Sequence, residues 1–353
     1  MAALLSGCGS ISYYGQAISG HLDVMQRRQP ITTLLADPDT PAPLRERLQT
    51  ALAIRRFAST ELGLPDNASY RSYADLERDF VVWNVIATPP LSLEPREWCF
   101  LLVGCLQYRG YYSAAEARRF AQTQSDNGDD VFVGGVTAYS TLGWFDDPVL
   151  NTMLKESDAR LAQVIFHELA HQQLFIKGDT EFNEAFADSI GITGTRRWLS
   201  ASGRHDQLDR YEQQRAQEER VIELIMTTRT RLERIYTSDR SDATKRARKQ
   251  AEIARLRRDY KRLSAAKWPD QSRFDAWFAA DINNASLAAV ATYRELVPDF
   301  LRLQAALDHD LDRFFASVAE LATCSQNERR EWLKRRKPTG DCRVRLANSA
   351  ASR

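Results

Sequence analysis

The pentapeptide His167-Glu168-Leu169-Ala170-His171 constrains this chain more than any other feature. It lies within residues 161–173, a stretch with helical periodicity and neither glycine nor proline. Positions i and i+4 share one face of a helix, so the two imidazoles point to the same place and Glu168 lies beside them. This is the HExxH pattern, in which two neutral histidines bind zinc and the glutamate is the general base. The chain has only five histidines, so two of them at this spacing are stronger evidence for a zinc site than the five-residue pattern alone.

A zinc site needs a third protein ligand, and a second helical segment offers one. Residues 182–188, Phe-Asn-Glu-Ala-Phe-Ala-Asp, follow His171 after a short interval. Glu184 and Asp188 are again four residues apart and share a helix face. One carboxylate would bind the zinc, and the other would orient a ligand histidine through its free N–H.

The two segments, His-Glu-Leu-Ala-His-Gln and Asn-Glu-Ala-x-x-Asp-x-x-Gly, together resemble the gluzincin metallopeptidases, the superfamily of thermolysin and alanyl aminopeptidase. The resemblance implies one Zn²⁺ ion with three protein ligands: His167, His171 and Glu184. It makes Glu168 the catalytic base, makes Asp188 the carboxylate that orients His167, and places Asn183 next to the ligand glutamate. The interval between the segments is several residues shorter than in thermolysin-like enzymes, which requires a tight turn at residues 177–179.

Other segments resemble a bacterial family of predicted aminopeptidases. They comprise residues 13–17, 108–112, 138–145 and 283–293. Because they span most of the chain, the resemblance is not confined to the zinc motif. It implies a peptide substrate and cleavage of peptide bonds, with the aminopeptidase activity itself inferred from the motif.

Two further roles follow from the gluzincin resemblance. A donor should stabilise the oxyanion, and Tyr293 is the first candidate, with Tyr139, His205 and His309 as rivals. The alternative for Tyr293 is a helix residue that faces the core. An edge strand before the zinc helix should pair with the substrate backbone, and Gly135 and Tyr139 lie in the segment that would do so. The alternative there is an ordinary strand with a glycine bulge.

Charge and hydropathy exclude several classes of protein. The chain has 48 Lys+Arg against 47 Asp+Glu and a net charge of +1, whereas nucleic-acid binders carry a basic excess. No run of 18 uncharged apolar residues exists, so no transmembrane helix is expected. We therefore expect neither a nucleic-acid partner nor a membrane-spanning segment.

The first residues resemble a lipoprotein signal. Leu5-Ser6-Gly7-Cys8 matches a lipobox, although the preceding apolar segment is shorter than the about 7–15 residues of a signal peptide. If Cys8 is acylated, the protein is held at a membrane by its lipid, facing the periplasm, and Gly9 favours the outer membrane of a bacterial cell envelope. If the match is accidental, the protein is cytoplasmic.

The remaining cysteines are even in number, which in an exported protein allows two disulfides. Pairs 99–105 and 324–342 are the simplest of three connectivities. The alternative is four buried free thiols. No Cys-x-x-Cys spacing occurs, so a cysteine zinc site or redox motif is not expected.

The periodicity predicts a mainly helical α+β protein, in which a small, mostly antiparallel sheet packs on the zinc-binding helices of a gluzincin-like core. Strands are expected at residues 80–87, 98–103 and 131–139, and helices over most of residues 13–79. The predicted divisions are a truncated signal at 1–8, helices, sheet and zinc helices at 9–200, a projecting coiled-coil hairpin at 201–265, a C-terminal helical block at 266–335 and a polar tail at 336–353. Mixed charges over 203–265 favour solvated helix faces, with docking of a protein partner as the alternative.

Two functional hypotheses follow. The first is an active zinc metallopeptidase, exported and lipid-anchored. The second is a catalytically silent envelope scaffold with structural zinc and a partner-binding hairpin. Structural zinc sites are closed by four protein ligands, and the sequence offers three, which favours the enzyme.

Overall fold

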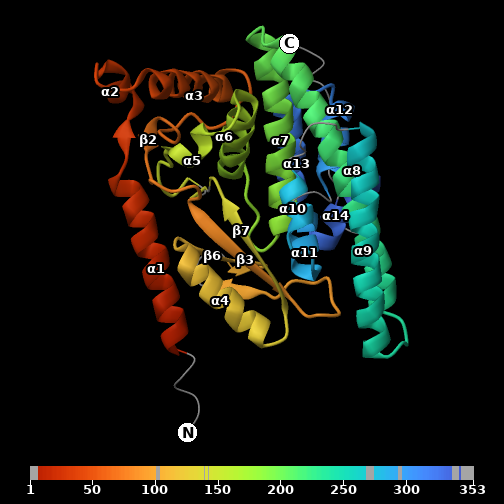
Figure 1. Ribbon diagram of the computed structural model, residues 1–353. Coiled ribbons are helices and arrows are strands. Elements are labelled where there is room, and N and C mark those ends of the chain that lie inside the picture. The colour runs from red at the N-terminus through yellow and green to blue at the C-terminus, as the bar shows by residue number, and fades with distance from the viewer. Residues whose placement is uncertain are drawn as a thin grey trace. The chain divides into compact units, whose positions relative to one another are not determined.

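The structure is a computed structural model that describes residues 7–100, 104–138, 140, 141, 143–267, 274–292, 296–335 and 342. The described chain is α+β and mainly helical, with three small sheets of two or three strands (Figure 1). No described helix combines the length and the hydropathy needed to cross a bilayer. The chain forms two compact units, residues 1–17, 82–136 and 209–292 in the first and 18–81, 137–208 and 293–353 in the second.

The strands are short and are followed along the chain by long helices. The strands are β1 (Gln29–Pro30), β2 (Ser72–Ala74), β3 (Val82–Thr88), β4 (Trp98–Phe100), β5 (Gly104–Leu106), β6 (Arg109–Tyr111), β7 (Asp130–Val136) and β8 (Val149–Leu150). The helices up to the candidate site are α1 (Gly7–Gln26), α2 (Ile31–Ala36), α3 (Ala42–Thr60), α4 (Ala114–Asp126), α5 (Asn151–Leu154), α6 (Asp158–Gln173) and α7 (Thr180–Ala201). The later helices are α8 (His205–Tyr236), α9 (Asp242–Lys267), α10 (Asp275–Ala279), α11 (Asn284–Thr292), α12 (Val297–Ala306), α13 (Leu311–Ala322) and α14 (Gln326–Arg335).

The first unit is built on the antiparallel sheet β6-β3-β7, in which β3 is central. Side chains alternate between the two faces of a strand, and Trp83 and Val85 of β3 and Val131 and Val133 of β7 pack in a cluster with Tyr111 of β6 and Ala117 of α4. Helix α11 also packs on β3 and β7. Two helices that lie far apart in the sequence, α4 and α11, thus pack on the same sheet.

A second core of the first unit lies between α8 and α9, which are joined by residues 237–241. Apolar residues recur along both helices and pack with those of α10 and α11. Buried Lys249 of α9 donates to the Pro90 carbonyl and pairs with Asp130 of β7, whose carboxylate also accepts the Asn284 N–H. This satisfied polar network fixes the hairpin to the sheet.

The second unit is organised around α6 and α7, which run side by side (Figure 1). Helix α3 packs on α6 and helix α12 on α7. Phe182 and Phe186 of α7 meet Phe300 of α12 and Phe314 of α13 in edge-on and stacked contacts. Helices α6 and α7 are therefore both packed against several other helices.

The structure corrects two details of the predicted fold. The single sheet expected from the sequence is wrong, because the strands divide into sheets β1-β2-β8, β6-β3-β7 and β4-β5. The sequence predicts helices over most of residues 13–79, but the last of these helices, α3, ends at Thr60. Three residues later the backbone of Gly63 has a φ of 65°, which lies outside the range of a right-handed helix. The expected pairs Cys99–Cys105 and Cys324–Cys342 both form disulfides.

Candidate metal centre

Helix α6 presents the His-Glu-x-x-His residues on a rigid support. Ser157 caps its N-terminus by accepting the Arg160 N–H, and its uninterrupted helix-forming sequence runs to Gln173. His167 and His171 are one turn apart, and Glu168 and His171 are buried. The helix therefore fixes the direction of both imidazoles before any ligand binds.

Helix α7 supplies the carboxylates after a linker of only a few residues. The linker turns at Gly178, whose φ is 82°, and the Asp179 N–H donates to the Ile176 carbonyl. The Asp179 side chain caps α7 by accepting the Phe182 N–H. Asn183 accepts the Ile176 N–H at 2.8 Å and donates to the Ile176 carbonyl at 2.7 Å, which holds the linker against the helix. A tight turn at 177–179 thus accommodates the short interval.

Small residues on α7 let the two helices approach closely. A Cβ atom built on Gly191 would lie 2.9 Å from the Gln163 carbonyl oxygen and 3.5 Å from the His167 Cβ. A Cβ on Gly194 would lie 2.6 Å from the Phe166 ring. A larger side chain at Gly191 would press on the α6 backbone and force the helices apart, so this glycine sets the distance between the imidazoles and the α7 carboxylates, whereas at Gly194 it would press on side chains.

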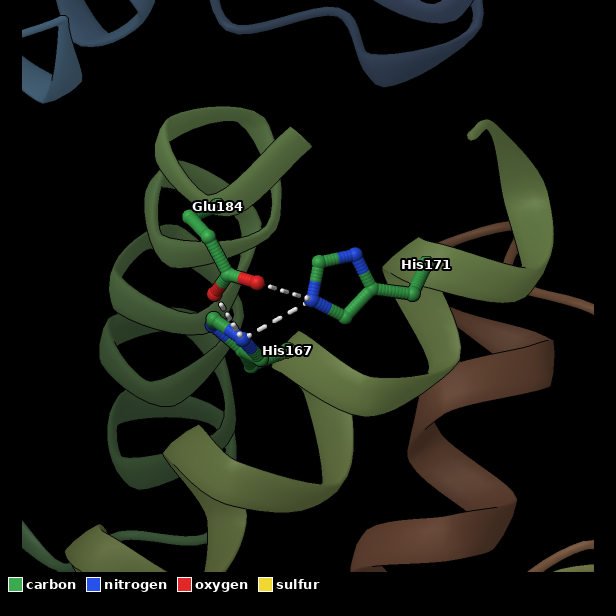
Figure 2. Close-up of side chains that lie close together, drawn as sticks. All are labelled: His167, His171 and Glu184. Atoms are coloured by element: carbon green, nitrogen blue, oxygen red, sulfur yellow. Dashed lines mark hydrogen bonds and ion pairs between the residues drawn. The ribbon is translucent and has the colours of Figure 1, made fainter. Parts of the chain in front are cut away.

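The three expected ligands converge on one point (Figure 2). The Nε2 atoms of His167 and His171 are 3.1 Å apart, and Glu184 places its two carboxylate oxygens 3.4 Å from the first and 3.7 Å from the second. Two ligands on a tetrahedral Zn²⁺ at bond lengths of about 2.0–2.1 Å are separated by about 3.3 Å. The donor types and their separations are compatible with a single divalent metal ion such as Zn²⁺ held by these three residues.

The second carboxylate of α7 contacts the outer nitrogen of one imidazole. Asp188 Oδ1 lies 3.1 Å from His167 Nδ1, on the side of the ring opposite the ligand nitrogen. When Nδ1 donates its hydrogen to this carboxylate, the neutral imidazole has its free lone pair on Nε2. Within the described residues, the buried His171 Nδ1 has no hydrogen-bond partner. Of the two imidazoles, only that of His167 is therefore held by a carboxylate at its outer nitrogen.

Burial and opposite charges shift the pKa values of the site without a metal. Burial alone would lower the pKa of His167, but the Asp188 and Glu184 carboxylates raise it well above its usual value. Burial would raise the pKa of Glu184, but the two imidazoles hold it far below its usual value. Burial raises the pKa of Glu168, against the opposing effect of both histidines. Glu184 is therefore an anion, as a metal ligand must be.

Sequence reasoning missed an acidic residue near Glu168. Asp147 is 1% exposed, and its Oδ2 accepts the Thr141 N–H at 2.8 Å while its Oδ1 has no hydrogen-bond partner within the described chain. Burial, with a contribution from the Glu168 charge, raises the pKa of Asp147 to about 7. The only sequence signal is its place in Asp146-Asp147-Pro148 directly before a strand, which by itself indicates a loop.

Five further residues were predicted as oxyanion donors or as parts of a substrate-binding strand. Gly135 lies in β7, a terminal strand of its sheet, opposite Trp83 of β3. Tyr139 and Tyr293 lie outside the described residues. The rival His205 begins α8, and His309 precedes α13 with a φ of 59°. The oxyanion donor and the substrate strand stay predictions.

The fold and the centre define a mainly helical α+β protein with a His-His-Glu group suited to a divalent metal. A family described as "Putative aminopeptidase" matches residues 12–333, and the chain belongs to this family. No curated protein and no solved structure matches the chain. Membership in this family supports a peptidase-like function.

Proposed function

We propose that this protein is a zinc-dependent peptidase of gluzincin type. The observation that carries the proposal is the convergence of three donors of the types and separations that Zn²⁺ requires, with Glu168 next to one of them on the same helix. Membership in the aminopeptidase family agrees with this chemistry.

The chain's own residues have distinct roles in this proposal. His167, His171 and Glu184 hold the ion, and Asp188 keeps His167 in the tautomer whose Nε2 can bind. When bound, zinc activates a water molecule and polarises the scissile carbonyl group as a Lewis acid. Glu168 accepts the proton of the attacking water on its carboxylate and passes it to the leaving amine.

The alternative of a silent scaffold with structural zinc is less well supported. Such sites are closed by four protein ligands, commonly cysteines. Here the described residues provide three donors, and four of the five cysteines are paired in disulfides. A fourth position left for water is the arrangement that catalysis needs.

The finer parts of the proposal concern substrate and location. We propose a peptide substrate cleaved at its amino-terminal end, with β7 as the strand that pairs with the peptide and Tyr293 as the oxyanion donor. We further propose that Cys8 is acylated and that the protein acts in the bacterial cell envelope. Each of these has its own test, by substrates with free and acetylated amino termini, by Tyr293→Phe and by mass analysis of Cys8.

The central experiment replaces Glu168 by glutamine. Glu168→Gln should keep one zinc per chain, since it leaves the ligands in place, but should lower the turnover of a peptide library by about 10²- to 10⁴-fold. Exposed Glu156→Gln, two residues before α6, is the matched control and should change neither quantity. Undiminished hydrolysis by Glu168→Gln would remove Glu168 from the mechanism, and a purified protein that retains no zinc would remove the metal.

A further inference from the structure

Exposed apolar side chains gather on α1 and on one loop. The described residues contain six large hydrophobic side chains that are exposed, and three of them, Tyr14, Ile18 and Leu22, recur every four residues along α1. This spacing places them on one helix face. Trp144 and Phe145 are two of the others, at 76% and 52% exposure.

The loop lies against the second half of α1. The Phe145 ring is 4.7 Å from that of His21, which is three residues after Ile18 and so lies one helical turn from it. Arg28, just beyond α1, donates to the Asp146 carbonyl at 2.9 Å. These two contacts bring the loop to the part of α1 that carries Ile18 and Leu22. We call the exposed side chains of Ile18, Leu22, Trp144 and Phe145 the apolar patch.

The helical part of the apolar patch has no charged residue before Asp23, whereas in the loop exposed Asp146 follows Phe145. Residues 1–22 contain no Asp, Glu, Lys or Arg. Burial and the nearby Arg28 lower the pKa of His21, which keeps the imidazole neutral at pH 7. Because exposed apolar side chains that gather in one place are typical of interaction sites, the apolar patch is a candidate binding surface.

We propose that the apolar patch rests on a lipid bilayer, with its side chains in the region between headgroups and acyl chains. Cys8, the proposed lipidation site, is in the first turn of the same helix, and ten residues of helix place Ile18 about 15 Å from it. A lipid anchor at that position would hold the patch at the membrane surface. Tryptophan and aliphatic side chains on one face of a helix are the residues that interfacial helices bury.

The test uses the full chain with Cys8→Ser, so that no lipid anchor contributes. We expect it to co-sediment with phosphatidylcholine vesicles and with vesicles containing phosphatidylglycerol, with weak salt dependence because the contact is apolar. Ile18→Gln with Leu22→Gln should lower the partition coefficient by about tenfold or more, and so should Trp144→Ser. Phe175→Ser, another exposed aromatic residue outside the patch, is the matched control and should bind as the parent does.

The measurement requires neither zinc nor turnover, so Glu168→Gln in the same background should bind vesicles equally well. The proposal is overturned if the Cys8→Ser protein does not bind vesicles, or if the patch variants bind unchanged. It is also overturned if those variants instead convert a dimer to a monomer in light scattering, which would make a second copy the partner. Circular dichroism confirms that each variant is folded.

Discussion

Replacing Gly191 by alanine tests whether the close approach of α6 and α7 builds the metal centre. The added methyl group would lie 2.9 Å from the Gln163 carbonyl oxygen, which is backbone and cannot rotate away. The same methyl group would lie 3.5 Å from the His167 Cβ. The two helices must therefore separate by a few tenths of an ångström at the turn that carries one ligand.

The magnitude follows from the ligand distances. Glu184 already places its oxygens 3.4 and 3.7 Å from the imidazole nitrogens, at or beyond the about 3.3 Å of a tetrahedral ion. The metal-free protein can accommodate a larger distance between the Glu184 oxygens and the imidazole nitrogens. The zinc-bound protein cannot, because all three ligands must reach the same ion. Overpacking a protein interior costs about 1–3 kcal/mol. If this cost falls on the zinc-bound protein alone, it lowers the affinity for zinc about 5- to 150-fold.

The assay is zinc competition with a chromophoric chelator, with circular dichroism to establish that the variant is folded. Gly194→Ala is the control, because its methyl group would meet Phe166 and Leu62 rather than a ligand. It should lower the melting temperature and leave the zinc affinity of the folded protein close to the parent value. If Gly191→Ala binds zinc as tightly as the parent, helix spacing does not set the ligand geometry.

Three further predictions address the surroundings of the site. Asp188→Ala removes the partner of His167 and should weaken zinc binding about 10- to 100-fold in the same assay, and unchanged affinity would contradict an orienting role. The pKa of Asp147 rises from its ordinary 3.8 to about 7, so the folded state holds a proton that the unfolded state releases. The free energy of unfolding should therefore fall by up to about 4 kcal/mol between pH 4 and 8. In denaturant titrations Asp147→Asn should make this free energy depend less on pH. An equal pH dependence of parent and variant would refute the prediction. Arg329→Leu leaves Asp179, the cap of α7, as an unpaired buried charge and should cost about 3–5 kcal/mol, part of which Asp179→Asn in the same chain should restore.

The local chemistry of the site was predictable because it depends on spacing along helices. His167 and His171, like Glu184 and Asp188, are four residues apart, and any α-helix of that sequence puts each pair on one face. The β-branched and aromatic runs likewise marked β3 and β7, and a charge-dense sequence with an apolar stripe marked α8 and α9. These features need only the neighbours in the chain.

The sheet arrangement was not predictable in the same way. Strand pairing joins segments far apart in sequence, so that β2 pairs with β8 and β3 with both β6 and β7. A two- or three-residue strand carries too little periodicity to select its partner. Asp147 was missed for a related reason, because its burial comes from residues outside its own loop.

The sequence by itself determined which side chains can bind a metal and on which helix face each pair lies, since the period of the α-helix is fixed by backbone geometry. Only the tertiary structure decided that the two faces meet. That meeting depends on Gly191 and Gly194 fitting against α6 and on Asn183 holding the short linker, and these are contacts between segments whose positions no local pattern specifies.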